Sequence, residues 1–317
     1  MKITFLGGTC AIGKSAVAVK TGETTVVLDY GVAMDGVPSF PMHIAPRDVD
    51  LVIVTHAHLD HSGAVPLFHV SRPIPVYATP VTFDLMELLL NDFLRLSGYY
   101  LPYEYLDTKT MFEFSRPLRY GEKVSVKDVE FTLVNAGHIP GSAQVLLEAE
   151  GKRILYTGDI NDVDTCLLKG AFRDYGPLDA VIIESTYADE EHPERDELEK
   201  EFVESILEVV EGGGKVLVPA FSVGRSQEVL TVLTKWRFEY PMAVDGMAVD
   251  ATQIFLKHVD WLRDPELFKK AVRTAKWVSG WKDRRLLLKK ECVIIAPAGM
   301  LKGGTAVFYA EKLAKSG

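Results

Sequence analysis

The stretch LVIVTHAHLDHSGAVPLF, residues 51–68, decides how this chain folds. Its first four residues are apolar and predict a buried strand, which runs directly into a group of histidines and an aspartate. His56 and His58 are two residues apart, so in an extended segment their side chains point to the same side. Asp60 and His61 follow where the chain bends into a helix, and they can turn to the other side. One short loop can therefore supply two ligands to each of two neighbouring metal ions.

Imidazole and carboxylate groups together suit zinc, and this density of both within six residues favours a metal site over ordinary surface histidines. We interpret His43, His69 and His258 as ordinary core or surface residues. Two further segments offer matching ligands. His138 lies in a predicted turn between two strands, and Asp159 ends another apolar strand, where a carboxylate can bridge two cations.

The composition is that of a soluble globular protein that is large enough for one or two cores: 317 residues, 47% hydrophobic and 25% charged. No apolar run approaches the length of a membrane span, and the N-terminus lacks the apolar region of a signal peptide. The three cysteines, Cys10, Cys166 and Cys292, are widely separated. They predict neither a disulfide framework nor a zinc knuckle, and they favour a cytoplasmic location.

Charge is distributed unevenly along the chain. The formal net charge of −9 argues against a general nucleic-acid-binding protein. Residues 189–211 hold eleven acidic and two basic side chains, whereas residues 263–302 hold eleven basic and four acidic ones. A globally acidic protein of this kind can still present one basic face to a nucleic acid.

The first half of the chain predicts many short strands and one amphipathic helix over residues 83–96. The strands are expected at Ile3–Leu6, Ala16–Lys20, Val26–Asp29, Leu51–Thr55, Pro75–Ala78, Glu130–Val134, Gln144–Glu148, Arg153–Thr157 and Ala180–Glu184. From about residue 194 onward, helices and strands alternate, which predicts a small parallel sheet. We therefore expect a first domain over residues 1–190 and a second over residues 191–317.

The N-terminal stretch FLGGTCAIGKSA, residues 5–16, matches the phosphate-binding pattern G-x-x-x-x-G-K-[ST]. That motif requires a helix that begins at the lysine and serine. No helix of ten residues fits between Ser15 and the turn at Gly22. We therefore predict a glycine-rich connection in a β-hairpin and not a nucleotide site.

A strand ending in Asp29, the motif HAHLDH at 56–61, His138 and TGD at 157–159, in that order, resemble the metallo-β-lactamase superfamily. Later segments narrow the resemblance to the β-CASP nucleic-acid-processing branch: VIIESTYAD (181–189), PAFSVGRSQEVL (219–230), VDGMA (244–248) and VIIAPAGMLKGG (293–304). This branch includes ribonuclease J and the nuclease subunit of the cleavage and polyadenylation specificity factor, and the chain is most similar to archaeal members without a KH region. The resemblance implies an α/β fold, with an αββα sandwich and an inserted domain built on a parallel sheet.

The resemblance also implies a role for each matching residue. One zinc would be held by His56, His58 and His138, a second by Asp60 and His61, and Asp159 would bridge the two. Asp29 and Glu184 would act with Asp60 in the catalytic centre by orienting ligands. For Asp29 and Glu184 the alternative is an ordinary carboxylate at the end of a strand.

The function implied is that of a zinc-dependent ribonuclease, in which a metal-bound hydroxide hydrolyses phosphodiester bonds of single-stranded RNA. Two loops that follow strand ends and precede helices look suited to the RNA backbone, and they contain Ser222, Gly224, Arg225, Lys302 and Gly303. Tight turns with packing glycines are the alternative. Residues 269–290 interleave basic side chains with Trp277 and Trp281, and here we favour a solvated helix with its tryptophans turned inward over a base-stacking surface.

One departure from the family concerns the end of the chain. Members continue past the GMLxGG loop into a segment that supplies two more histidines, whereas no histidine follows His258 here. We therefore expect an incomplete second zinc site and weakened activity. A truncation or split gene, a natural short member, and a ligand donated by another copy or by a processing-complex partner all remain open. The alternative function is a non-catalytic RNA-binding or scaffold subunit.

Overall fold

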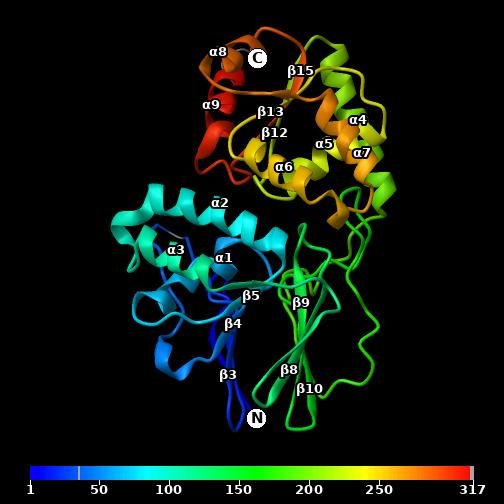
Figure 1. Cartoon of the computed structure of the whole chain (residues 1–317). Coiled ribbons are helices and arrows are strands. Elements are labelled where there is room, and N and C mark those ends of the chain that lie inside the picture. Colours follow the sequence, from blue (N-terminus) through cyan, green and yellow to red (C-terminus); the bar gives the residue numbers. More distant parts are fainter. Residues whose placement is uncertain (35, 315–317) are drawn as a thin grey trace. The chain divides into compact units, whose positions relative to one another are not determined.

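The computed structural model describes every residue except Asp35 and Lys315–Gly317 (Figure 1). Contacts within the chain divide it into two compact units. Unit 1 comprises Met1–Val163 and Gly170–Ser185, and unit 2 comprises Asp164–Lys169 and the chain from Thr186 onward. The chain therefore passes into unit 2 for a few residues, returns to unit 1, and leaves it again after Ser185.

A six-stranded sheet of unit 1 has the order β1-β2-β3-β4-β5-β6. Its strands are β1 (Lys2–Gly7), β2 (Ala16–Lys20), β3 (Thr25–Leu28), β4 (Leu51–Ile53), β5 (Val76–Ala78) and β6 (Ser115–Pro117). Strands β1 to β3 pair antiparallel, and β3 to β6 pair parallel. All residues of β3 and β4 are buried, which explains why these strands are continuously apolar in sequence.

A five-stranded sheet forms the second layer, with the order β11-β10-β9-β8-β7. Its strands are β7 (Lys123–Val126), β8 (Val129–Asn135), β9 (Ala143–Ala149), β10 (Lys152–Tyr156) and β11 (Ala180–Ile182). Buried and half-buried residues largely alternate along β8, as expected where one face of a sheet meets the core. The short strands β6 and β7 were not predicted from the sequence, whereas the other strands of these two sheets lie within two residues of their predicted positions.

The core of unit 1 lies between these two sheets. Buried side chains of the first sheet, including Val19, Val26 and Ile53, pack against Phe131, Leu147 and other residues of the second. The helices α1 (Leu59–Ser62), α2 (Pro80–Ser97) and α3 (Tyr105–Glu113) lie on the side of the six-stranded sheet (Figure 1). A mixed α/β fold is thus confirmed for this part of the chain.

Helix α2 begins three residues before the predicted start at residue 83. Thr79 caps it by accepting a hydrogen bond from the Thr82 N–H, and Pro80 occupies the first turn. This threonine–proline start signal is strong because the proline has no N–H to leave unbonded. The apolar periodicity alone missed it, since the first turn adds few residues to the apolar face.

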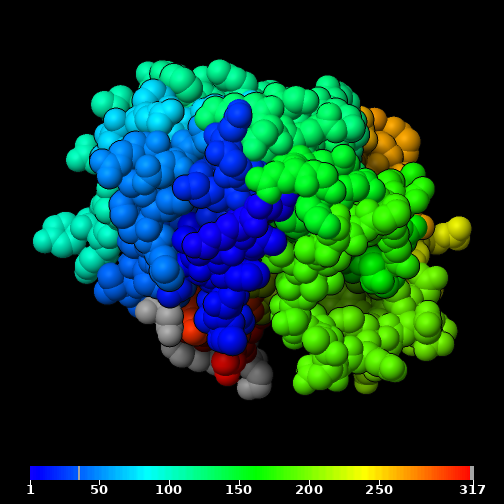
Figure 2. All heavy atoms as spheres, turned by 90° about the horizontal axis from the view of Figure 1, so that it is seen from below, coloured from blue at the N-terminus to red at the C-terminus, as the bar shows by residue number. Residues whose placement is uncertain are grey.

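The glycine-rich N-terminal stretch forms the connection between β1 and β2, which pair antiparallel. Strand β2 begins at Ala16, directly after Ser15, so no helix follows the GKS sequence. The prediction of a hairpin in place of a phosphate-binding loop is confirmed. Figure 2 shows the N-terminal strands beside the green second sheet, and the turn at Thr24 contacts the turn at Asp128 through a side-chain hydrogen bond.

Unit 2 is built on a parallel sheet with the order β12-β15-β13-β14. The strands are β12 (Lys215–Pro219), β13 (Met242–Val244), β14 (Lys276–Trp277) and β15 (Cys292–Ala296). Val293 and Ile295 of β15 pack in one apolar cluster, and Cys292 and Ile294 in another, so the sheet is covered on both faces. The alternation of strands and helices predicted this parallel sheet.

Helices α4 (Arg195–Glu211) and α5 (Arg225–Lys235) contribute to the first of these clusters, and α8 (Trp281–Leu287) and α9 (Gly304–Leu313) to the second. The other helices are α6 (Ala248–Lys257) and α7 (Pro265–Thr274), and the 3-10 turns are η1 (Pro46–Asp48), η2 (Val65–Val70), η3 (Gly98–Tyr100) and η4 (Val259–Trp261). Within the described residues, no helix has the length and apolar character required to span a membrane.

The prediction of one solvated helix over the basic stretch 269–290 is wrong. The stretch is divided among α7, β14 and α8. Trp277 is half-buried and donates a hydrogen bond to the Val272 carbonyl, whereas Trp281 is 57% exposed. The break occurs because the chain must return to the sheet edge at β14, a tertiary requirement that local charge patterning does not reveal.

Candidate metal centre

The histidine loop follows the buried end of β4. The N–H groups of His61 and Ser62 bond back to the His58 carbonyl, which starts the short helix α1 directly after the loop. The chain at Gly31 passes close beside this turn, and a Cβ atom on Gly31 would lie 1.6 Å from the Asp60 carbonyl oxygen. Only glycine fits there, so β3 and the loop can approach each other closely.

Four predicted ligands lie together at the ends of three strands. The ligand atoms of His56, His58, His138 and Asp159 all lie within 4.8 Å of one another. His58 Nδ1 is 3.2 Å from His56 Nε2 and 3.2 Å from His138 Nε2. Asp159 Oδ2 completes the group, 3.5 Å from His138 Nε2 and 3.8 Å from His56 Nε2.

A second group adjoins the first. It contains His56, Asp60 and His61, again with ligand atoms within 4.8 Å. His61 Nε2 lies 3.9 Å from Asp60 Oδ2 and 3.1 Å from Asp159 Oδ1. The two oxygens of Asp159 therefore face different groups of histidines, which is the arrangement of a carboxylate that bridges two cations.

Asp29 lies directly behind this second group and is completely buried. Its carboxylate accepts hydrogen bonds from the Thr55 N–H at 2.7 Å, the Thr55 hydroxyl at 2.8 Å and the Tyr156 hydroxyl at 2.9 Å. The remaining contact is with His61 Nδ1, at 2.8 Å. With Nδ1 bonded to Asp29, the Nε2 atom of His61 is left facing the cluster, which is how a carboxylate orients a metal-binding imidazole.

Burial and the closeness of the ligand groups shift the pKa values of the cluster. Burial lowers the pKa of His56 well below its usual value, and the neighbouring histidines lower it further. Burial would also lower the pKa of His61, but Asp29 and Asp159 outweigh it and raise that pKa well above its usual value. Burial would raise the pKa of Asp159, yet His61 and the other histidines hold it well below its usual range.

The donor set fits a divalent metal. Imidazole nitrogens and carboxylate oxygens converge on common points, and this combination is the one that zinc takes in proteins. The side chains of Asp60 and Asp159 are 36% and 32% exposed, so the cluster is open to solvent on the carboxylate side. A substrate could approach from that side.

Three further residues support the site and were not identified from the sequence. The Ser15 hydroxyl lies 3.4 Å from His61 Nε2, and Thr55 and Tyr156 hold Asp29. Tyr156 directly precedes the TGD segment, and Thr55 directly precedes the HAH segment. This closeness to predicted ligands is the sequence feature by which both residues could have been identified. Glu184 is half-buried and, within the described part of the chain, belongs to no group with metal-ligand spacing.

The predicted RNA-binding loops lie at the carboxyl ends of β12 and β15. Arg225 and Lys302 are exposed, and Ser222 and Gly303 are half-buried. The Gly224 N–H is already bonded to the Gln227 side chain at 2.8 Å, so this amide is not available to an anion. The expectation of free backbone N–H groups is therefore wrong at Gly224, although the exposed cations remain.

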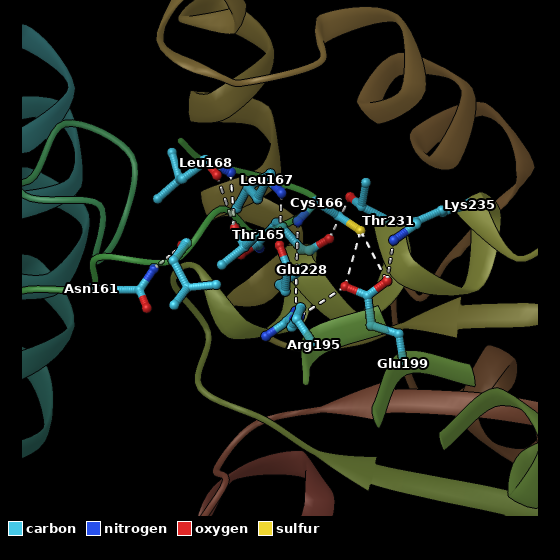
Figure 3. Close-up of polar contacts among 12 residues, drawn as sticks. Asn161, Thr165, Cys166, Leu167, Leu168, Arg195, Glu199, Glu228, Thr231 and Lys235 are labelled. Atoms are coloured by element: carbon cyan, nitrogen blue, oxygen red, sulfur yellow. Dashed lines mark hydrogen bonds and ion pairs between the residues drawn. The ribbon is translucent and has the colours of Figure 1, made fainter. Parts of the chain in front are cut away.

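A third group with metal-ligand spacing lies in unit 2 and was not predicted: Cys166, Glu199 and Glu228 (Figure 3). All three side chains are buried, and cations from the same unit surround them. No local pattern in the sequence marks this group, because Cys166 lies 33 positions from Glu199 and 62 positions from Glu228.

Comparison with known proteins agrees with the fold. A metallo-β-lactamase superfamily model matches residues 12–220, and a β-CASP domain model matches residues 226–316. A protein of unknown function from Enterococcus faecalis has a similar fold, with a TM-score of 0.56 and 15% identity over 93% of this chain and 77% of its own.

Several curated archaeal proteins are similar along nearly the whole chain. The "RNase aCSPSF2" of Saccharolobus solfataricus is 42% identical over 99% of this chain and 65% of its own length. "Probable RNase MJ4" of Methanocaldococcus jannaschii is 38% identical over 98% of this chain and 75% of its own. "Transcription termination factor FttA" of the same organism is 38% identical over 99% of this chain and 54% of its own. The chain thus spans between about half and three quarters of these relatives, and it belongs to the β-CASP branch of the metallo-β-lactamase superfamily.

Proposed function

We propose that the chain carries the catalytic metal centre and RNA-holding loops of a zinc-dependent ribonuclease that hydrolyses phosphodiester bonds of single-stranded RNA. The observation that carries the proposal is the convergence of His56, His58, His138 and Asp159 within 4.8 Å at the ends of separate strands. Two of the similar archaeal proteins are named as ribonucleases, which supports RNA as the substrate.

The chain's own residues have separate tasks in this proposal. His56, His58 and His138 would hold one zinc, Asp60 and His61 a second, and Asp159 would bridge them. When bound, zinc supplies a Lewis acid that activates water and neutralises phosphoryl charge. Asp29, whose carboxylate lies 2.8 Å from His61 Nδ1, would hold His61 in the tautomer whose Nε2 is free to bind a metal. Glu184 would act as an orienting carboxylate, and Arg225 and Lys302 would attract the RNA backbone.

The test is hydrolysis of a labelled single-stranded RNA by the purified chain, with and without a chelator. We expect cleavage that a chelator abolishes and that added zinc restores. His58→Ala should remove the activity, and Glu204→Gln, at an exposed position of α4, should retain it. Cleavage that persists after complete metal removal would contradict the proposal.

A non-catalytic RNA-binding subunit is the second candidate. It is favoured by the exposed cations of the unit 2 loops, which do not require the metal centre, and by the relatives named as a transcription termination factor. RNA retention in a filter-binding assay without turnover at any zinc concentration would support this candidate over the nuclease.

A further inference from the structure

Unit 2 contains a cluster of buried polar side chains that the proposed reaction does not use (Figure 3). Glu199 of α4 and Glu228 of α5 are each 5% exposed, and both bond to Cys166 in the segment Asp164–Lys169. Buried carboxylates are costly unless they are paired, so this cluster requires an explanation.

Metal binding does not explain the cluster. Glu199 accepts hydrogen bonds from Arg195 Nε at 2.8 Å and Lys235 Nζ at 2.7 Å, and Arg195 also forms an ion pair with Glu228. Each buried carboxylate is therefore already paired with a cation, and Lys235 is shared with the exposed Asp196, so a metal ion would have to displace these cations. Burial, together with the neighbouring carboxylates, raises the pKa of the Cys166 thiol to about 12, whereas metals bind the thiolate.

The cluster instead holds a peptide backbone. One oxygen of Glu228 accepts the N–H of Cys166 at 2.9 Å, and its other oxygen accepts the N–H of Leu167 at 2.8 Å. The side chains of Cys166, Leu167 and Leu168 are 7%, 3% and 5% exposed. The amides and side chains of this segment are thus bound as an enclosed ligand would be.

Arg263 contacts the acceptor groups of the same segment, which are two backbone carbonyls and one carboxylate. Its guanidinium donates to the Thr165 carbonyl at 2.8 Å and lies 3.3 Å from the Asp164 carboxylate. Its backbone N–H donates to the Leu167 carbonyl at 2.9 Å. The N–H groups of the segment therefore bond to the carboxylate of Glu228, and its carbonyl groups bond to the donors of Arg263.

The ends of the loop show that docking, and not chain connection, explains the segment. The Ala171 N–H donates to the Asn161 carbonyl at 2.8 Å, and a Cβ atom on Gly170 would lie 2.4 Å from the Asp162 carbonyl oxygen. The chain at Gly170 and Ala171 therefore lies next to the chain at Asn161 and Asp162, and a short turn would be enough to connect them. Ordering the extra residues costs conformational entropy, which the buried contacts of the loop tip must offset.

We propose that Glu228, together with Glu199 and Arg263, forms a docking site for the peptide Asp164–Lys169, and that this docking is required for efficient RNA cleavage. The second part rests on the proposed function. The docked peptide follows Asp159 by a few residues, and Glu228 lies one turn after Arg225 on α5. The docked peptide is thus linked along the chain to a proposed metal ligand, and through α5 to a proposed RNA-binding cation. Glu228 is a positioning residue, because its described contacts include neither metal ligand nor substrate.

The experiment compares the wild-type chain with Glu228→Gln, which keeps the size of the side chain and removes its charge and one acceptor. In hydrogen exchange followed by mass spectrometry, we expect peptides that contain Cys166 and Leu167 to exchange at least about tenfold faster. We also expect kcat/KM for RNA to fall by at least about tenfold, mainly through KM, while hydrolysis of bis(p-nitrophenyl) phosphate changes less than about twofold. A purely structural role would lower both activities together.

Arg263→Gln is the second variant, because Arg263 is exposed and its loss should not prevent folding. Arg237→Gln, at another exposed arginine of unit 2, is its matched control. Unchanged exchange at Cys166 and Leu167 in both Glu228→Gln and Arg263→Gln would overturn the docking site. Faster exchange with unchanged RNA cleavage would overturn its functional role. If the wild-type chain cleaves neither substrate, the proposed function fails, but the exchange result still decides whether the peptide is docked.

Discussion

The two adjoining groups of unit 1 and the group of unit 2 each place their ligand atoms within 4.8 Å of one another, and the two units differ in how these charges are balanced. In unit 1, the carboxylates of Asp60 and Asp159 face only imidazoles. In unit 2, Glu199 and Glu228 face Arg195 and Lys235. Among the described residues, no lysine or arginine forms an ion pair with Asp60 or Asp159, whereas the cluster of unit 2 already holds one of each.

This difference shows why ligand spacing alone does not identify a metal site. A metal ion must supply positive charge that the protein has left out, and the cluster of unit 1 leaves it out. In unit 2 an added cation would have to displace Arg195 or Lys235 from a buried carboxylate. We therefore assign metal binding to unit 1 and peptide docking to unit 2, and the predictions below test that assignment.

The largest expected effect is on the metal centre. His138→Ala removes one of three imidazoles from the first group, so we expect bound zinc to fall and RNA cleavage to drop by at least about 1,000-fold, or about 4 kcal/mol in transition-state free energy. Metal content is measured by elemental mass spectrometry after dialysis. Cys166→Ser should leave the metal content unchanged. A loss of metal in Cys166→Ser would contradict the assignment of metal binding to unit 1 alone.

A smaller effect is expected from the charge balance of unit 2. Glu199→Gln leaves Arg195 and Lys235 without one buried carboxylate, so we expect unit 2 to lose about 3 kcal/mol of unfolding free energy. The fluorescence of Trp236 reports this directly, because its Nε1 donates to Glu199 at 3.1 Å. Zinc content should stay at the wild-type level, and guanidinium titration of Glu204→Gln provides the control. Stabilisation by added zinc in unit 2 would favour a metal site there instead.

The sequence reveals those parts of the metal centre that depend on local spacing. His56, His58, Asp60 and His61 occupy one loop, so the strand and the alternation of side chains fix their directions before any tertiary contact is known. Asp159 could be placed because it ends an apolar strand. These predictions needed only the knowledge that strand ends gather at one edge of a sheet.

Features that depend on long-range contacts could not be predicted in this way. The bond from Tyr156 to Asp29 joins residues 127 positions apart, and the docking of Cys166 onto Glu228 joins residues 62 apart. Nothing local distinguishes Glu228 from other helical glutamates. The exposure of Trp281 was missed for the same reason, since it depends on where the chain returns to the sheet.

The buried histidine His69 sharpens the comparison because no ion pair is described for it. Its side chain is 5% exposed, so it is a core residue as interpreted from the sequence, but neither ring nitrogen has a hydrogen-bond partner among the described residues. Burial lowers its pKa to about 4, against a small opposing effect of Asp107. As the pH falls, His69 is therefore protonated in the unfolded chain at a higher pH than in the folded chain.

The stabilising effect of a neutral His69 is fully present above about pH 6.5 and is lost progressively towards pH 4. Between pH 7 and pH 4.5 we expect the wild-type chain to lose about 2.5 kcal/mol more unfolding free energy than His69→Leu. Urea titrations of both proteins at each pH measure this difference. His43→Asn, at an exposed histidine, should follow the wild-type profile, and an equal loss in His69→Leu would show that His69 does not titrate in this range.

The smallest expected effect concerns Arg225, which lies on the same helix as Glu228 but differs from Arg195 in its surroundings. Arg225 is exposed, and the structure describes no ion pair for it, whereas Arg195 is neutralised by two buried carboxylates. An arginine that is not neutralised within the protein can neutralise an RNA phosphate and release the counter-ion that was bound to the RNA.

For Arg225→Ala we therefore expect RNA affinity to fall by about 1 kcal/mol or less, and the slope of log K against log salt to decrease in magnitude by about 0.7. Arg237→Ala, which removes an equal charge elsewhere on unit 2, should leave that slope unchanged. Equal changes in both variants would show that RNA responds to the overall charge of unit 2 and not to the loop at Arg225.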